Sequence, residues 1–334
     1  MVSAVIFVAT SCVSPLTGFA FWETNLAYEG ESIYNYLQVK NLSDRTILST
    51  NVLFGVQSVT MKDKGLTGMY YDTALAAPAL ADNANSALIL GMGTGTYARQ
   101  LKQYYPKMNI TGVEIDQKIT DLAGEYFDEP ADIPVTTYDG RAWLAASHDK
   151  YDVIMVDAYQ DITIPFQMSS TEFFTMVREH LNPGGVMVVN MNMISDGQGS
   201  INEALSDTIA SVFGNGNTLT ADVPNTTNRE LFAKKPGSGA EENSMQQASK
   251  ALNLRETTYE RTGSEDLEWY MEEVASRFRK VNEPDSASTI LTDDKAPVEV
   301  LGMHAIDQII ADEAGPYRQI LKDEGFGGLL RAVQ

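Results

Sequence analysis

Short apolar segments alternate with amphipathic segments between residues 86 and 190, and this alternation restricts the fold more than any other feature of the chain. Strands that alternate with helices in this way predict a sheet of mostly parallel strands with helices on both faces. The sequence therefore predicts a doubly wound α/β fold. The predicted strands are residues 87–90, 110–114, 135–138, 151–156 and 185–190. The predicted helices are one that ends at 105, one over 117–127, a short one that begins at 139–141 and one over 170–181.

The segments on either side of this core follow other patterns. Residues 31–59 are rich in aromatic and β-branched residues and contain a turn-like stretch, which predicts a small antiparallel module. A helical stretch at 68–80 leads into the core, and residues 218–223 and 230–234 would close the sheet as a hairpin. The predicted units are an apolar segment (1–22), a β-hairpin domain with its connecting helix (23–80), a nucleoside-binding domain (81–236) and a linker with C-terminal helices (237–334).

Residues 2–21 contain no charged side chain. The segment is about long enough to cross a bilayer, although Ser, Thr, Gly and Pro dilute it, and no basic residue precedes it as in a secretory signal. An anchor, a remnant of a longer membrane domain, a cleaved signal and a buried helix all stay open. We expect membrane association, with the body on the cytoplasmic face because Lys40 and Arg45 follow the segment.

Charge and composition exclude several classes of protein. The chain has 45 acidic and 24 basic residues and a formal net charge of −21, so its surface repels nucleic acid. Its single cysteine, Cys12, excludes a disulfide framework. Three histidines far apart in the sequence give no ligand spacing, so we expect no metal site.

Acidic residues end the predicted strands. A Gly-Met-Gly-Thr-Gly turn (91–95) follows the first strand, where glycine lets the backbone approach a ligand at a helix N-terminus. Glu114 ends the second strand, where an acid typically binds ribose hydroxyls; Asp139 and Asp157 end the third and fourth. Because sites in such sheets lie at the carboxyl ends of the strands, these residues predict a nucleoside site.

The ordered motifs resemble the spermidine synthase family, the polyamine aminopropyltransferases. The resemblance covers about residues 31–190 and is greatest to a divergent bacterial branch often fused to a membrane transporter-like domain. The motifs are Tyr34-Asn35, Gln57, Tyr70-Tyr71-Asp72, the turn 91–95, 113–116, Asp139-Gly140, 151–157, then Asp157-Ala158-Tyr159, Ile164-Pro165-Phe166, 171–174, 292–294 and 296–299.

This resemblance implies a small β-domain on a Rossmann-like class I methyltransferase fold. It implies that decarboxylated S-adenosylmethionine donates an aminopropyl group to putrescine or a related amine, without a metal, in a homodimer. A carboxylate must then accept the proton of the amine as the amine attacks. By resemblance, Asp157 is the catalytic base and Tyr70 orients the amine; Gly91, Gly93, Thr94, Gly95, Glu114, Asp139, Gly140, Gln57 and Asn35 hold the donor; and Tyr70, Asp72, Tyr159, Gln160 and Asp161 line the amine site.

Two positions depart from the family pattern. Thr94 stands where the family has an aspartate that pairs with the ammonium of the donor, and Gln160 stands where it has a second aspartate. Asp161 would replace one of them if it shifted along its loop. Without a carboxylate at Thr94, the turn would also suit unmodified S-adenosylmethionine, whose own carboxylate an aspartate repels. A small-molecule methyltransferase and a non-catalytic nucleotide-sensing domain of a membrane protein therefore stay open as alternatives.

Overall fold

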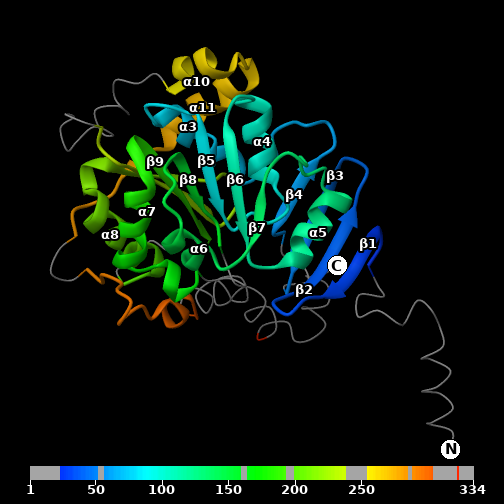
Figure 1. The fold of residues 1–334 in the computed structure, drawn as a ribbon, viewed down its shortest axis with the longest axis horizontal. Helices are drawn as coiled ribbons and strands as arrows, with labels where there is room; N and C mark the ends of the chain where they lie inside the picture. The colour runs from blue at the N-terminus through cyan, green and yellow to red at the C-terminus, as the bar shows by residue number, and fades with distance from the viewer. Residues whose placement is uncertain are drawn as a thin grey trace, which may run out of the picture.

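The computed structural model describes residues 23–51, 56–158, 164–192, 199–237, 254–284, 288–303 and 322. They form two sheets, a four-stranded sheet near the start of the chain and an eight-stranded sheet that follows it (Figure 1). Within these residues no helix is long and apolar enough to cross a membrane. Residues 2–21, for which we predicted membrane association, lie outside the described ranges.

The small sheet is antiparallel throughout, as predicted. Leu37, Val39 and Leu48 form its buried face and pack against Ile119, Leu122 and Phe127, in and just after helix α5 (Gln117–Tyr126). The large domain therefore supplies the other half of this core. The strands are β1 (Leu26–Glu31), β2 (Tyr36–Asn41), β3 (Arg45–Thr50) and β4 (Ser58–Met61), in the order β1-β2-β3-β4.

The large sheet has the order β12-β10-β11-β9-β8-β5-β6-β7. The strands from β9 to β7 pair in parallel, whereas β11, β10 and β12 add to the other edge in antiparallel register. The predicted doubly wound fold with a closing hairpin is confirmed. The strands are β5 (Ser86–Leu90), β6 (Asn109–Glu114), β7 (Val135–Thr137), β8 (Tyr151–Val156), β9 (Leu181–Asn192), β10 (Thr218–Asp222), β11 (Asn228–Lys234) and β12 (Arg279–Lys280).

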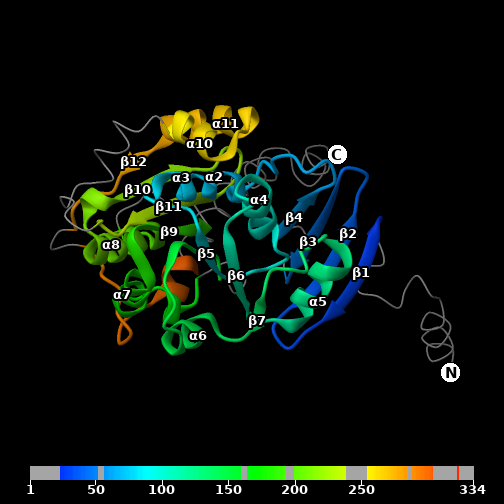
Figure 2. The same ribbon diagram turned by 45° about the horizontal axis from the view of Figure 1, so that its top comes forward.

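Helices cover both faces of this sheet (Figure 2). One face carries α2 (Tyr70–Ala74), α3 (Ala76–Leu80), α4 (Thr96–Tyr104), α10 (Leu254–Thr262) and α11 (Glu265–Arg277). The other face carries α6 (Gly140–Ala146), α7 (Thr171–His180) and α8 (Ile201–Phe213), while α5 (Gln117–Tyr126) lies against the small sheet. The division of the chain into four units stays a prediction.

Helix α8 was not predicted. Its apolar residues Ile201, Ala204, Leu205 and Ile209 follow helical spacing, but we predicted no element between residues 190 and 218. A capping box would have revealed it: the Ser200 side chain accepts a hydrogen bond from the Glu203 amide, and the Glu203 carboxylate accepts one from the Gly199 amide.

Phe127 tests whether the small sheet shares a core with the segment of helix α5. Its side chain is completely buried between α5 and the small sheet. Phe127→Ala should lower the free energy of unfolding by about 3–5 kcal/mol in urea denaturation, because it leaves a cavity there. Ile33→Ala, at a side chain that is 90% exposed, is the control and should change stability by less than about 0.5 kcal/mol. Equal effects of the two substitutions would contradict a shared core.

Candidate active site

A cavity of about 230 Å³ lies where the carboxyl ends of β5, β6, β8 and β9 meet the small sheet. Both sheets contribute to its walls, so it exists only in the assembled fold. Most residues that the sequence predicted for the site line it: Asn35, Gln57, Tyr70, Gly91, Gly93, Glu114, Asp139, Gly140 and Asp157.

The glycine turn after β5 has a backbone that side chains would block. Gly91 has a φ of 87°, and a Cβ atom there would lie 2.4 Å from the backbone oxygen of Asp157. Gly93 has a φ of 56° and lines the cavity, and Gly95, with a φ of 77°, is the N-cap of α4. The turn therefore lies tightly against the end of β8 and leaves room for a ligand above it.

Glu114 is fixed at the end of β6 by backbone amides. Its carboxylate accepts hydrogen bonds from the Gly93 amide at 2.8 Å and from the Asp116 amide at 3.0 Å. Burial raises the pKa of Glu114, and these hydrogen bonds oppose that rise. The carboxylate thus lies in one orientation beside the glycine turn, at the cavity wall.

Asp139 both caps a helix and lines the cavity. Its carboxylate caps α6 by accepting a hydrogen bond from the Ala142 amide at 2.8 Å, and the residue also lines the cavity. Beside it lie Tyr138 and Ile115, which are 56% and 41% exposed although they are large and apolar. Together these residues form an open apolar rim with a polar acceptor, the kind of surface on which a planar base stacks.

Asp157 is the central ionisable group of the cavity. Its carboxylate accepts a hydrogen bond from the Tyr70 hydroxyl at 2.5 Å and another from the Asn190 side-chain amide at 2.9 Å. Burial raises the pKa of Asp157 to about 7, with a smaller rise from the charge of Glu114, and the two hydrogen bonds act against it. A carboxylate with this pKa can take up a proton near neutral pH.

Helix α2 brings two tyrosines to this carboxylate. Burial, followed by the charge of Asp157, raises the pKa of Tyr70 well above its usual value, so its hydroxyl stays protonated and donates. The Tyr71 ring lies 4.0 Å from the Tyr70 ring, and its hydroxyl donates to the backbone oxygen of Gln57 at 2.8 Å. Tyr71 therefore links the residue before β4 of the small sheet to the side of the cavity that contains Asp157.

Some predicted site residues lie elsewhere. Asp72 is completely buried outside the cavity wall, where it accepts hydrogen bonds from the Thr67 and Gly68 amides and from Gln100. It holds the turn before α2, so no amine contact is assigned to it. Thr94 and Gly95 also lie outside the lining, and Thr94 is completely buried. Tyr159, Gln160 and Asp161 lie outside the described residues.

Sequence reasoning missed several polar residues of the cavity. Strand β9 runs past the end of β8, and its residues Asn190 and Asn192 line the cavity with Asn228 of β11. Asn190 ends a run of buried apolar residues, which is the signal that identified Asp157, and so it was detectable. The others missed in the lining include Tyr34, Ser58, Tyr97 and Gln167.

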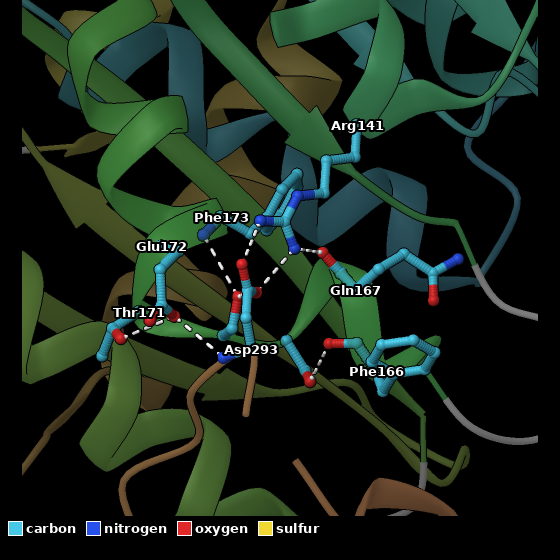
Figure 3. Close-up of polar contacts among 9 residues, drawn as sticks. Arg141, Phe166, Gln167, Thr171, Glu172, Phe173 and Asp293 are labelled. Carbon is cyan, nitrogen blue, oxygen red and sulfur yellow. Dashed lines mark hydrogen bonds and ion pairs between the residues drawn. The ribbon is translucent and has the colours of Figure 1, made fainter. Parts of the chain in front are cut away.

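A salt bridge and its hydrogen bonds join α6 to the C-terminal residues 292–294 (Figure 3). Arg141 donates to both carboxylate oxygens of Asp293, at 2.7 and 2.5 Å, and to the backbone oxygen of Gln167 at 2.7 Å. Asp293 also accepts a hydrogen bond from the Ser170 hydroxyl at 2.5 Å. The C-terminal 292–294 motif thus fixes the short helix Phe166–Met168, whose residues Gln167 and Met168 line the cavity.

Comparison with known families agrees with this geometry. The family model described as spermine/spermidine synthase domain matches residues 69–235, half of the chain. The chain belongs to the spermine/spermidine synthase family. The matched range includes Tyr70, the glycine turn, Glu114, Asp139 and Asp157, which are the residues that the structure brings together around the cavity.

Curated proteins named polyamine aminopropyltransferases match this chain over different lengths. A probable polyamine aminopropyl transferase of Bifidobacterium longum (strain NCC 2705) is 99% identical over the whole chain, which covers 75% of that protein. A polyamine aminopropyltransferase of Corynebacterium efficiens is 37% identical over 131 residues, 36% of this chain and 25% of that one. One from Vibrio vulnificus is 28% identical over 209 residues, 60% of this chain and 69% of that one.

Solved structures share the fold. A probable spermidine synthase from Corynebacterium glutamicum superposes with a TM-score of 0.57 and 22% identity, covering 80% of this chain and 99% of that one. A spermidine synthase in complex with the transition state analogue AdoDATO gives a TM-score of 0.56 and 17% identity, covering 78% and 85%. These likenesses confirm the predicted Rossmann-like fold with its preceding β-domain.

Asp157→Asn tests the raised pKa of Asp157. In the wild type the buried carboxyl favours its protonated form, so stability falls as pH rises from about 4 to about 7. Asparagine carries no charge, so the variant does not lose this stability. The free energy of unfolding of the variant minus that of the wild type should therefore be about 2–4 kcal/mol higher at pH 8 than at pH 4. Urea denaturation at both pH values measures this difference. An equal relative stability at the two pH values would contradict the raised pKa.

Proposed function

We propose that this chain transfers an aminopropyl group from decarboxylated S-adenosylmethionine to a small amine such as putrescine. The observation that carries the proposal is the Asp157 carboxylate, which Tyr70 and Asn190 hold in a cavity next to a nucleoside-type glycine turn. The name of the 99% identical relative from Bifidobacterium longum supports the same reaction.

The cavity fits a nucleoside donor. Gly91 and Gly93 leave the space that side chains would fill, and Glu114 presents an anchored carboxylate that accepts hydrogen bonds from ribose hydroxyls. Tyr138 and Asp139 offer an apolar ring and an acceptor to adenine at the open rim. Gln57 and Asn35 line the side that the small sheet contributes, where the aminopropyl end of the donor would lie.

The proposed chemistry needs one proton acceptor and no metal. The amine arrives as an ammonium ion, and the Asp157 carboxylate accepts a proton from its nitrogen. The lone pair that this frees attacks the carbon next to the sulfonium of the donor. A new carbon–nitrogen bond forms as the carbon–sulfur bond breaks, and the electron pair of the broken bond leaves the nucleoside as a neutral thioether. Tyr70 and Asn190 keep the carboxylate in one orientation throughout.

Asp157→Asn should remove turnover while it preserves donor binding. Without a base the amine stays protonated, and loss of a general base costs about 10²–10⁴-fold in rate. Single-turnover transfer to 1,4-diaminobutane measures the rate, and calorimetry with decarboxylated S-adenosylmethionine measures binding. Phe166→Ala is a control at an exposed side chain beside the cavity wall and should keep most of the activity. Unchanged turnover in the Asp157 variant would contradict its role as the base.

Methyl transfer from S-adenosylmethionine is the second candidate, and Thr94 favours it. The turn 91–95 carries no carboxylate, so nothing there attracts the ammonium of a decarboxylated donor or repels the carboxylate of the unmodified one. A nucleotide-sensing domain without turnover, a homodimer and membrane association through residues 2–21 stay predictions. The 99% identical relative is longer than this chain, which covers 75% of it.

Donor preference separates the two transfer reactions. We expect calorimetry to show at least tenfold tighter binding of decarboxylated S-adenosylmethionine than of S-adenosylmethionine, which equals about 1.4 kcal/mol. The physical reason is the acidic surroundings of Asp157, which favour a cationic donor tail. The reverse preference would support methyl transfer. Binding of both donors without transfer to any amine would support the sensing alternative.

A further inference from the structure

Glu230 on β11 is a buried carboxylate without a hydrogen-bond or ion-pair partner among the described residues. Its side chain is completely buried, and neither of its oxygens has a hydrogen-bond partner among the described residues. The ion pairs of the described part of the chain also leave it out. Buried carboxylates are normally paired or hydrogen-bonded because an isolated one is costly. Within the described residues, both oxygens are therefore buried acceptors without a donor.

The sheet register places Glu230 in one row with Asp157. Strands β8 and β9 pair Val156 with Val189, so the following residues, Asp157 and Asn190, lie side by side. Strands β9 and β11 pair Asn190 with Glu230, and directly paired residues direct their side chains to the same face. Neighbouring strands lie about 4.8 Å apart, so the backbones of the two acids are separated by about 10 Å with Asn190 between them.

Glu230 is not among the lining residues of the cavity, but its neighbours are. Asn190 and Asn228, its neighbours on the same face of β9 and β11, both line the cavity and hydrogen-bond to each other at 2.8 Å. The negative charge of Glu230 contributes to the raised pKa of Tyr71 and of Tyr97, so both phenols lie near it, and both line the cavity. Glu230 therefore lies directly behind the wall that faces Asp157.

The electrostatics favour a cation near Glu230. Burial is the main reason that the pKa of Glu230 is raised well above its usual value, and the charge of Asp157 adds to it. A positive charge placed between the two acids would favour the ionised form of both carboxyl groups, against the effect of burial and of their mutual repulsion. An ammonium group fits because it offers three N–H donors to acceptors that have none.

We propose that Glu230 pairs with the non-reacting ammonium of a diamine acceptor, while Asp157 takes the proton from the reacting end. This inference rests on the proposed aminopropyl transfer. The two nitrogens of 1,4-diaminobutane are about 6 Å apart when extended, by bond lengths of about 1.5 Å. With a hydrogen bond at each end, such a molecule bridges two carboxylates whose strands lie two positions apart in the sheet.

Glu230 would thus supply a carboxylate that the turn 91–95 lacks. Thr94 and Gln160 occupy positions where related sequences carry aspartates, and Thr94 is buried away from the cavity. Glu230 reaches the same region from β11, a strand that pairs with β9 rather than with the glycine turn. Its role is then acceptor specificity: it selects diamines over monoamines of the same length.

The test compares 1,4-diaminobutane with 1-aminobutane, which lacks the second ammonium, in the wild type and in Glu230→Gln. We expect the wild type to prefer the diamine at least 100-fold in kcat/KM. The isosteric Glu230→Gln should reduce this preference at least tenfold, chiefly through a higher KM for the diamine, and leave 1-aminobutane unchanged. Glu230→Asp, which keeps the charge, should retain part of the preference.

Asp152→Asn is the matched control. Asp152 is also a buried carboxylate of this sheet, but it lies at the start of β8 and accepts hydrogen bonds from the Asn85 amide and from Asn182. Its loss should lower stability without changing the diamine preference. A Glu230→Gln variant that keeps the full preference, or loses activity equally toward both amines, overturns the proposal.

Calorimetry with 1,4-diaminobutane, in the presence of the donor, tests the ammonium site at Glu230 independently of aminopropyl transfer. If the wild type transfers no aminopropyl group to either amine, the proposed function fails, and diamine binding still tests Glu230. Binding that weakens at least tenfold in Glu230→Gln supports the ammonium site. Binding of equal strength in the two proteins, confirmed as folded by circular dichroism, overturns it.

Discussion

The carboxylate of Asp157 is the point on which the arrangement of the site depends. It receives hydrogen bonds from Tyr70 on α2 and from Asn190 on β9, while its backbone amide donates to Leu90 at the end of β5. Three elements that are distant in sequence therefore meet at one residue. Because the group is buried, these donors hold the carboxylate in a fixed orientation and moderate the rise of its pKa.

The buried acids at this edge of the sheet differ in the hydrogen-bond donors that they have. Glu114 has two backbone amide donors, Asp157 has a phenol and an amide, and Glu230 has no donor among the described residues. A buried acid with fewer hydrogen-bond donors gains more from a nearby positive charge. This series of acids therefore suits the cationic donor and amine that we propose as ligands. The net charge of −21 contributes little to this selectivity, since exposed charges are screened whereas buried ones are not.

Contacts away from Asp157 also hold residues of the cavity wall in place. Arg141 and Asp293 connect α6 to the C-terminal segment and hold the backbone of Gln167 at the cavity wall (Figure 3). Tyr71 connects α2 to Gln57 beside the small sheet. Neither contact reaches the proposed reacting atoms, but each fixes a wall whose residues come from separate parts of the chain.

Local patterns were sufficient to predict the alternation of strands and helices over residues 86–190, the glycine turn and the acids at the strand ends. Each of these follows from periodicity or from the backbone freedom of glycine, which neighbouring residues alone determine. They were insufficient for the place of Asp72, which hydrogen bonds from Thr67 and Gln100 hold outside the cavity. Helix α8 was missed although its capping box is a local signal. The row of Asp157, Asn190 and Glu230 depends on pairing between β8, β9 and β11. Only the tertiary structure decides it, because strand register is fixed by the burial of whole faces rather than by any one segment.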